Sequence, residues 1–213
     1  MVELVRIALA VLLLAVGQAS AQSPVSPAGV NVGDSAPAWD TLEGVDGEYY
    51  GSKDLASTPI LVICFTSNTC PYSVDYEDRL MALQKKYGES GQAVRVVAIN
   101  SNATDGDSLK KMIERAERKK FNFLYLRDED QLVAKAFGAI YTPEFFVLDR
   151  GRRVVYKGAL DDSSKAENVT RSYVELAIAA IQNGKSPEVT KTGARGCAIR
   201  FPRRRRRKPY DKS

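Results

Sequence analysis

Cys70 is the residue whose type and position most clearly suggest chemistry. A run of apolar β-formers from Ile60 to Thr66 precedes it, and Pro71 follows it at the start of a pattern with helical spacing. Proline suits the first position of a helix, because its missing N–H would be unpaired there anyway. A thiol at a helix N-terminus lies near unpaired N–H groups and the positive end of the helix dipole, and both favour the thiolate. Since the thiolate attacks disulfides and peroxides, Cys70 is a candidate nucleophile, with an inert capping cysteine as the alternative.

Ser67 stands three residues before Cys70, at the position where a dithiol redox motif would carry its partner cysteine. A serine hydroxyl forms no disulfide, so Cys70 has no local partner for dithiol cycling. A hydroxyl at this spacing has another use, because it can hydrogen-bond a thiolate or hold a peroxide oxygen. The S-x-x-C motif is therefore either a site that has lost its activity or a single-thiol site in which Ser67 takes part.

The remaining cysteines and the lack of histidine narrow the chemistry further. The chain has three cysteines and no histidine, which excludes His-based triads, His-assisted cysteine proteases and metal sites that use histidine. Three scattered cysteines do not make a structural zinc site, and we expect no metal or other cofactor. Cys197 follows a glycine in a polar segment and is the candidate to condense with an oxidised Cys70, with a bystander role as the alternative. Cys64 lies inside the apolar run, where a free cysteine behaves as a small buried hydrophobe.

Thr142 and Pro143 form a second candidate feature, directly before an expected strand that begins at Glu144. X–Pro bonds carry only a small cis penalty, so Pro143 follows either a cis bond or an ordinary trans bond at the start of the strand. A turn here could bring the backbone of Thr142 beside the sulfur of Cys70. An extended thiol substrate would then pair with that backbone, which makes Thr142 and Pro143 candidate substrate-binding residues.

Strands and helices alternate along the chain. The expected strands are short runs rich in β-branched or aromatic residues, and they cover residues 60–66, 93–100, 123–126, 144–148 and 153–156. The expected helices have apolar residues at helical spacing, and they cover residues 71–86, 107–119, 130–137 and 172–182. This alternation predicts an α/β fold with a central mixed, mostly parallel sheet flanked by helices, and with a C-terminal β-hairpin and helix.

The ends of the chain differ in composition from its body. Residues 1–21 have a basic residue, a short apolar core and an A-x-A cleavage signal, which predict a secretory signal peptide, with an uncleaved anchor as the alternative. Residues 22–33 are rich in Pro, Ser and Gly and are expected to form a flexible leader before a domain at 34–201. Export would place the domain in an oxidising compartment, where a disulfide can persist.

The positive charge is concentrated in the last segment, residues 202–213. The net charge is +5, and residues 203–208 alone supply six positive charges. The domain itself is therefore close to neutral, and it has no basic face with interspersed aromatic residues, so we expect no nucleic-acid partner. A block of like charges predicts a solvated, disordered tail, and contact with an acidic surface is the alternative.

Several separated phrases together resemble the thioredoxin superfamily. The resemblance is closer to the bacterial redoxin group of the alkyl hydroperoxide reductase and thiol-specific antioxidant family, and it extends from about residue 32 to residue 201. The phrases that carry it are Ser67–Tyr72, Tyr76–Leu80, Ala98–Asn102, Ala139–Val147, Gly158–Asp162 and Gly196–Arg200. The resemblance implies a thioredoxin-like fold and thiol redox chemistry. In that group the first cysteine of a C-x-x-C attacks and the second resolves, and Ser67 replaces the first cysteine here.

The site is also similar to the T-x-x-C motif of peroxiredoxins. There the cysteine attacks peroxide and the threonine hydroxyl is positioned to hydrogen-bond, which implies a comparable part for Ser67. Peroxiredoxins carry a proline four residues before that threonine, where this chain has Ile63. They also use an arginine beside the thiolate, for which Arg127 and Arg150 are the candidates.

From these features we expect a thiol-dependent oxidoreductase, exported to the periplasm or another extracytoplasmic space of a bacterium. Cys70 would carry out peroxidase-like antioxidant chemistry or thiol–disulfide exchange, on a peroxide or on a protein thiol or disulfide. An external thiol would supply the electrons. The alternative is a non-catalytic module that has lost the first motif cysteine and serves as a thioredoxin-like binding or structural envelope protein.

Overall fold

The computed structural model describes residues 29–88 and 93–201. The predicted signal peptide, most of the predicted leader and the predicted basic tail lie outside these residues. The strands are β1 (Leu42–Gly44), β2 (Tyr49–Tyr50), β3 (Ile60–Thr66), β4 (Val94–Asn100), β5 (Leu124–Arg127), β6 (Tyr141–Thr142), β7 (Glu144–Leu148), β8 (Val154–Gly158) and β9 (Cys197–Ala198). The helices are α1 (Pro71–Gly88), α2 (Leu109–Lys119), α3 (Leu132–Phe137) and α4 (Tyr173–Gln182), with 3₁₀ turns η1 (Asp105–Asp107) and η2 (Ala166–Asn168).

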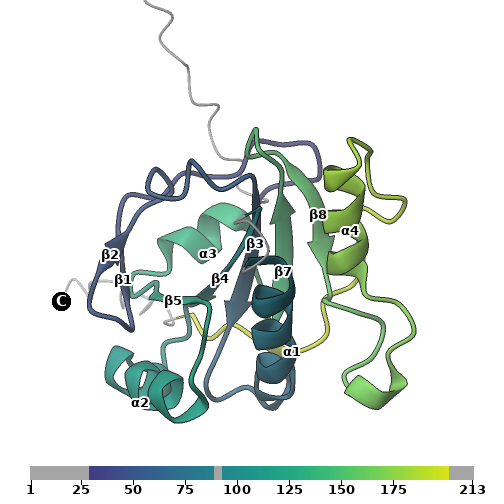
Figure 1. Ribbon diagram of the computed structural model, residues 1–213. Helices are drawn as coiled ribbons and strands as arrows, with labels where there is room; N and C mark the ends of the chain where they lie inside the picture. Colours follow the sequence, from purple (N-terminus) through teal and green to yellow (C-terminus); the bar gives the residue numbers. More distant parts are fainter. Residues whose placement is uncertain (1–28, 89–92, 202–213) are drawn as a thin grey trace, which may run out of the picture.

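A mixed sheet forms the centre of the domain (Figure 1). Its strand order is β2-β1-β5-β4-β3-β7-β8, and a separate small sheet pairs β6 with β9. The β3–β4 and β4–β5 pairs are parallel, whereas β7 and β8 form an antiparallel hairpin beside β3. The predicted α/β fold with a mixed sheet, flanking helices and a C-terminal hairpin and helix is confirmed. The prediction that the sheet is mostly parallel is wrong: of the strand pairs that the structure describes in it, only β3–β4 and β4–β5 are parallel, because β7 and the short β1–β2 hairpin pair antiparallel on either side of them.

The sheet buries both of its faces, and β3 explains why its sequence is continuously apolar. Ile60, Val62 and Cys64 belong to the core that α1, α2 and α4 cover. The alternate residues Leu61, Ile63 and Phe65 belong to the core on the other face, which α3 and the segment before β1 cover. A strand buried on both faces has no polar alternation, and this is the pattern that the sequence carries. Within the described residues, no helix has the length and apolar character needed to cross a membrane.

A buried polar clamp fixes the helix that follows Cys70. From α1, the Tyr76 hydroxyl donates to Asp161 at 3.0 Å, and the Arg79 guanidinium forms an ion pair with the same carboxylate at 2.5 Å. The guanidinium also lies 3.6 Å from the centre of the Tyr76 ring. Two phrases that lie far apart in the sequence, Tyr76–Leu80 and Gly158–Asp162, therefore meet and hold α1 against the end of the β7–β8 hairpin.

Candidate active site

Cys70 lies at the point that the sequence predicts, directly before α1 and beyond the carboxyl end of β3. Its side chain is buried, with 2% of its surface exposed. The thiol donates a hydrogen bond to the carbonyl oxygen of Thr142 at 2.9 Å. The peptide bond between Thr142 and Pro143 is cis. The backbone of Thr142 thus lies beside the sulfur, as the proline at the start of β7 suggested.

The small β6–β9 sheet brings Cys197 to the same place. Thr142 and Cys197 are directly paired in its antiparallel register, and the Thr142 hydroxyl donates to the Cys197 carbonyl oxygen at 3.3 Å. The thiols of Cys70 and Cys197 therefore lie near enough for each to influence the pKa of the other. All three cysteines of the chain are unbridged, and Cys64 is fully buried in the core behind them. Cys70 and Cys197 are 127 positions apart in the sequence (197 minus 70), so no local motif predicts that they lie together.

The two thiols of this pair have opposite acidities. Burial raises the pKa of Cys70, but hydrogen bonds from the Cys197 thiol, from Thr142 and from the N–H groups of Ser73 and Cys197 outweigh burial and lower it below the ordinary value. The pKa of Cys197 is raised to about 11, first by burial and then by its hydrogen bond to Cys70 and the charge of that thiolate. The contact of Cys70 with the Thr142 carbonyl oxygen is available only to the protonated thiol. The arrangement therefore makes Cys70 the more acidic thiol of the two, and Cys197 the one that keeps its proton to higher pH.

Ser67 is close to Cys70 in sequence, but its hydroxyl is engaged elsewhere. It is buried, it donates to Asp107 Oδ1 at 2.9 Å, and it accepts the N–H of Thr69 at 3.1 Å. In the part of the chain that the structure describes, no hydrogen bond joins Ser67 to Cys70. The serine therefore fixes the loop before Cys70, and its predicted contact with a peroxide stays a prediction.

Asp107 organises that loop, and the sequence suggested only a helix cap at this position. Its carboxylate is fully buried and accepts five hydrogen bonds. The donors come from loops and strand ends at one edge of the sheet: the side chains of Ser67, Thr69, Asn100 and Thr104 and the N–H of Asn68. Burial raises the pKa of Asp107, but the hydrogen bonds from Thr104, Asn100, Thr69 and Ser67 outweigh it, so the pKa lies below the usual range. We call these six residues the Asp107 cage.

Neither candidate arginine contacts the thiol pair. The Arg127 guanidinium donates to the carbonyl oxygens of Asn100 and Asn102 at 3.2 and 2.9 Å and pairs with Glu129 at 2.5 Å. Arg150 lies in the turn after β7, at the opposite end of the sheet, because Leu148 at the end of β7 pairs with Leu61 near the start of β3. The cation whose charge does reach the pair is Arg200, which lowers the pKa of Cys197.

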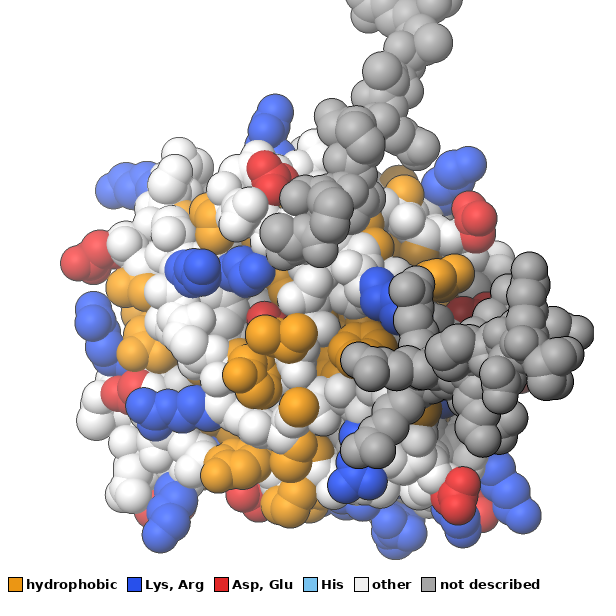
Figure 2. Space-filling view, turned by 180° about the vertical axis from the view of Figure 1, so that it is seen from behind, with side chains coloured by type: hydrophobic (Ala, Val, Ile, Leu, Met, Phe, Trp, Pro, Cys, Tyr) orange, Lys and Arg blue, Asp and Glu red, His pale blue; other side chains and the backbone are white. Residues whose placement is uncertain are grey.

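Other features near Cys70 had no signal in the sequence. The Ser73 hydroxyl, one turn into α1, is buried without a hydrogen-bond partner among the described residues, and the Ser73 N–H contributes to the lowered pKa of Cys70. Around the pair, Tyr72, Ile140 and Tyr141 expose 43%, 55% and 39% of their surfaces. Figure 2 shows that hydrophobic side chains gather in the middle and along the lower edge of one face of the molecule.

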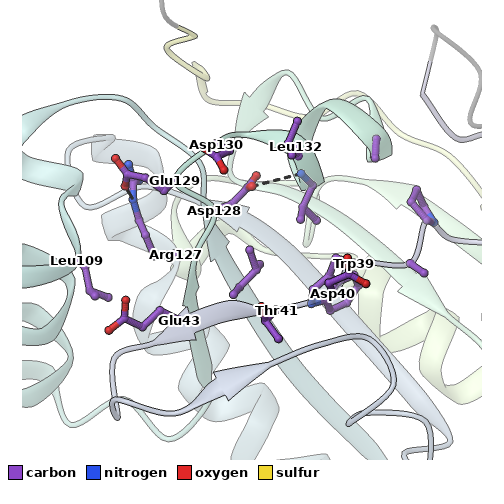
Figure 3. Close-up of a pocket in the computed structure, with 15 residues that line it drawn as sticks. Trp39, Asp40, Thr41, Glu43, Leu109, Arg127, Asp128, Glu129, Asp130 and Leu132 are labelled. Carbon is purple, nitrogen blue, oxygen red and sulfur yellow. Dashed lines mark hydrogen bonds and ion pairs between the residues drawn. The ribbon is translucent and has the colours of Figure 1, made fainter.

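A separate cavity lies away from the thiols. It has a volume of about 760 Å³ and is bounded by the segment from Pro37 to Glu43, the end of β5 and the start of α3 (Figure 3). Asp40, Glu43 and Glu129 are among the residues that line it. Arg127, one of the two candidate arginines, lines it, whereas Cys70, Cys197, Ser67, Thr142 and Pro143 do not, so the thiol pair and this cavity are distinct places on the molecule.

A cysteine at the strand-to-helix junction of a mixed sheet, facing a cis X–Pro bond, defines a thioredoxin-like protein. A family model described as Redoxin matches residues 31–173, and the chain belongs to this family. A hypothetical protein of Sinorhizobium meliloti is 32% identical, with a TM-score of 0.75 over 82% of this chain and 97% of its own. An uncharacterized conserved protein of Geobacillus kaustophilus is 33% identical, with a TM-score of 0.75 over 82% of this chain and 94% of its own.

A more distant likeness concerns the fold alone. A peroxidoxin of Mycobacterium tuberculosis is 22% identical, with a TM-score of 0.56 over 73% of this chain and 98% of its own. A comparison with curated proteins gives no significant match. The chain is thus a thioredoxin-like redoxin, and its particular activity has to be argued from its own thiols.

Proposed function

We propose that the protein is an exported, thiol-dependent peroxidase in which Cys70 attacks the peroxide and Cys197 resolves the product. The observation that carries this proposal is that Thr142 brings the two cysteines together: its carbonyl oxygen accepts a hydrogen bond from the Cys70 thiol at 2.9 Å, and it pairs directly with Cys197. The lowered pKa of Cys70 favours the nucleophilic thiolate, and the β6–β9 pairing holds Cys197 beside it. The family and the fold support thiol redox chemistry in general.

The first step consumes one peroxide. The Cys70 thiolate attacks the outer oxygen of a hydroperoxide, the O–O bond breaks, and the alcohol or water leaves after taking up a proton. Cys70 becomes a sulfenic acid, the first product of thiolate oxidation. The buried, unpartnered hydroxyl of Ser73 is a candidate to hold a peroxide oxygen during this step. Ser67, whose hydroxyl donates to Asp107, contributes by fixing the loop before Cys70.

The second step follows from what oxidation does to Cys197. Two of the causes that raise its pKa are the hydrogen bond to Cys70 and the charge of the Cys70 thiolate. A sulfenic acid carries no such charge, so the pKa of Cys197 falls when Cys70 is oxidised. The Cys197 thiolate then attacks the Cys70 sulfur, water leaves, and a disulfide forms. An external dithiol reduces this disulfide by thiol–disulfide exchange and supplies the two electrons that the peroxide consumed.

The alternative function is thiol–disulfide exchange with other proteins. In it, Cys70 and Cys197 would react with a protein thiol or disulfide instead of a peroxide. It requires the edge beside Thr142 to accept a polypeptide, and β9 already pairs with that edge. The peroxidase is therefore the better supported activity. Both activities fit the oxidising compartment that the predicted signal peptide at residues 1–21 implies.

Trapping the sulfenic acid tests the proposal. In Cys197→Ser the resolving thiol is gone, and we expect one equivalent of hydrogen peroxide to give a dimedone adduct at Cys70, identified by mass spectrometry. Cys64→Ala is the matched control and should give a disulfide and little adduct. No adduct and no disulfide at Cys70 in either protein, with the thiol shown to be reduced beforehand, would contradict the proposal.

A further inference from the structure

The backbone edge beside Cys70 is already occupied by a strand of the same chain. In the β6–β9 pair, Thr142 stands opposite Cys197 and Tyr141 stands opposite Ala198. The N–H of Ile199 continues this pairing and donates to the Ile140 carbonyl oxygen at 2.9 Å. An extended peptide that adds itself to a sheet edge uses the same backbone groups. The edge at β6 is therefore satisfied from within the chain.

Buried contacts on both sides hold β9 in place. After the strand, Ile199 is 5% exposed and packs into the core that α3 covers, and the N–H of Arg200 donates to the Asn102 side chain at 2.7 Å. Before the strand, the Thr192 hydroxyl accepts the N–H of Ala159 at 2.9 Å. Only residues 193–198 lie between these two anchors, so β9 stays over Cys70 unless an anchor is released.

Gly196 allows β9 to approach β6 this closely. A Cβ atom at this position would lie 2.0 Å from the Thr142 carbonyl oxygen and 2.6 Å from its carbon, which backbone atoms cannot accommodate. A Cβ atom at Gly193, in the same segment, would meet nothing within 4 Å. A single methyl group therefore forces β9 away from β6 at Gly196 and has no such effect at Gly193.

We propose that residues 196–199 act as an internal pseudosubstrate strand that keeps extended polypeptides from Cys70 and restricts this thiol to small hydroperoxides. The inference rests on the proposed function and names its substrate class. Cys197 occupies the place that a substrate cysteine would take opposite Thr142, so a protein disulfide reaches Cys70 only when the strand leaves. A hydroperoxide needs no backbone edge and only has to reach the sulfur atom, which fits a thiol with 2% of its surface exposed.

The excluded reaction is thiol–disulfide exchange with a peptide. In it the Cys70 thiolate attacks a peptide disulfide, the S–S bond breaks, a mixed disulfide forms, and the second thiol of the peptide disulfide leaves as a thiolate. The probe for this reaction is an eight-residue extended peptide whose cysteine carries a thionitrobenzoate disulfide, because the departing thiolate is coloured. The probe for the permitted reaction is hydrogen peroxide.

The test compares the full chain with Gly196→Ala and with Gly193→Ala as the matched control. We expect Gly196→Ala to raise the peptide rate at Cys70, relative to the peroxide rate, by about tenfold or more, a difference of about 1.4 kcal/mol in activation free energy. Gly193→Ala should leave the ratio unchanged. Amide hydrogen exchange at Ile199 checks the cause, since it should become fast in Gly196→Ala alone. Ile199→Asp, which releases the strand from its other end, should reproduce the shift.

Two results would overturn the pseudosubstrate strand. One is a ratio of peptide rate to peroxide rate that is the same in the wild type and in Gly196→Ala. The other is fast amide exchange at Ile199 in Gly196→Ala without a faster peptide reaction. If Cys70 reacts with neither probe in any variant, the proposed function fails. A binding measurement then tests the pseudosubstrate strand separately. The same peptide with serine in place of its cysteine should bind Gly196→Ala more tightly than the wild type in calorimetry, and equal binding would overturn the inference.

Discussion

The Asp107 cage and the thiol pair meet in the loop from Ser67 to Cys70, and they are built in opposite ways. In the cage, one buried carboxylate accepts five hydrogen bonds, so the loss of any donor leaves part of a buried charge unpaired and lowers stability. In the thiol pair, two neighbouring sulfur atoms influence each other's pKa and differ in acidity, so a change in the protonation or oxidation of one changes the acidity of the other. The beginning of the loop is fixed, and its end carries the reactive atom. This contrast assigns Ser67 to the support of the site and Cys70 to its chemistry.

Removing the reactive atom should have the largest effect. We expect Cys70→Ser to lower peroxide turnover by more than about a thousandfold, because no other described group can take over the attack. Steady-state consumption of hydrogen peroxide with an excess of dithiol measures this loss. Cys64→Ala is the control, since Cys64 is buried in the core and its loss should leave turnover largely intact. Equal losses in the two variants would mean that Cys70 has no special role.

Removing the charge of the cage should affect stability more than chemistry. Asp107→Asn places an amide where five donors converge, and we expect it to lower the free energy of unfolding by about 2 to 3 kcal/mol. Urea unfolding at pH 7 measures the loss. Asp105→Asn on the same turn is the control, because Asp105 is exposed and should change stability little.

The cage also gives stability a dependence on pH. The pKa of Asp107 in the folded protein lies below its value of about 3.9 in an unfolded chain. Its contribution is therefore complete above about pH 4 and is lost as the pH falls through the folded-state pKa. Unfolding measured between pH 7 and pH 3 should show a smaller loss in Asp107→Asn than in the wild type. An equal loss in both proteins would remove Asp107 from this role.

Removing the resolving thiol should change the acidity of the attacking one. In Cys197→Ala the Cys70 thiolate loses a hydrogen-bond donor, so we expect its pKa to rise and the midpoint of its alkylation profile to move to higher pH. Multiple-turnover peroxide reduction should fall by about tenfold or more, because no internal thiol resolves the sulfenic acid. A profile unchanged by the substitution would mean that the two thiols do not interact in solution.

Much of this arrangement could be predicted from local patterns. The apolar run that ends at Thr66 and the proline after Cys70 gave the strand and the start of the helix, because burial on both faces and the helix N-terminus each have a clear sequence signature. The glycine-flanked cysteine at position 197 and the proline at position 143 pointed to the remaining parts of the site. The alternation of strand and helix patterns gave the order of the elements between them, and the resemblance to the redoxin group implied the thioredoxin-like fold.

The rest depended on tertiary contacts that leave no local trace. β9 has only two residues and exists because it pairs with β6, so the sequence carries no apolar pattern that predicts it. Asp107 looks like a helix cap in the sequence, yet its side chain turns to residues that are up to 40 positions away. The orientation of Ser67 follows from Asp107, and neither candidate arginine could be placed before the ends of the strands were known.

The smallest effect is expected at Ser67. Ser67→Ala removes one hydrogen bond of the cage, so stability should fall by about 1 kcal/mol and the peroxide rate should change by less than about threefold. Ser73→Ala is the informative contrast, because the Ser73 hydroxyl has no partner among the described residues and the Ser73 N–H contributes to the lowered pKa of Cys70. Stopped-flow oxidation of Cys70 compares the two variants. A hundredfold loss in Ser67→Ala at unchanged stability would place Ser67 in the chemistry after all.

The central claim is that Cys70 and Cys197 are one redox unit. The most direct test is peptide mapping of the full chain without reductant, after treatment of the reduced protein with one equivalent of hydrogen peroxide. The account predicts a Cys70–Cys197 disulfide as the main product, with Cys64 still a free thiol, and full return to the dithiol when an external dithiol is added. Cys70 oxidised beyond the sulfenic acid while Cys197 remains a free thiol would contradict it.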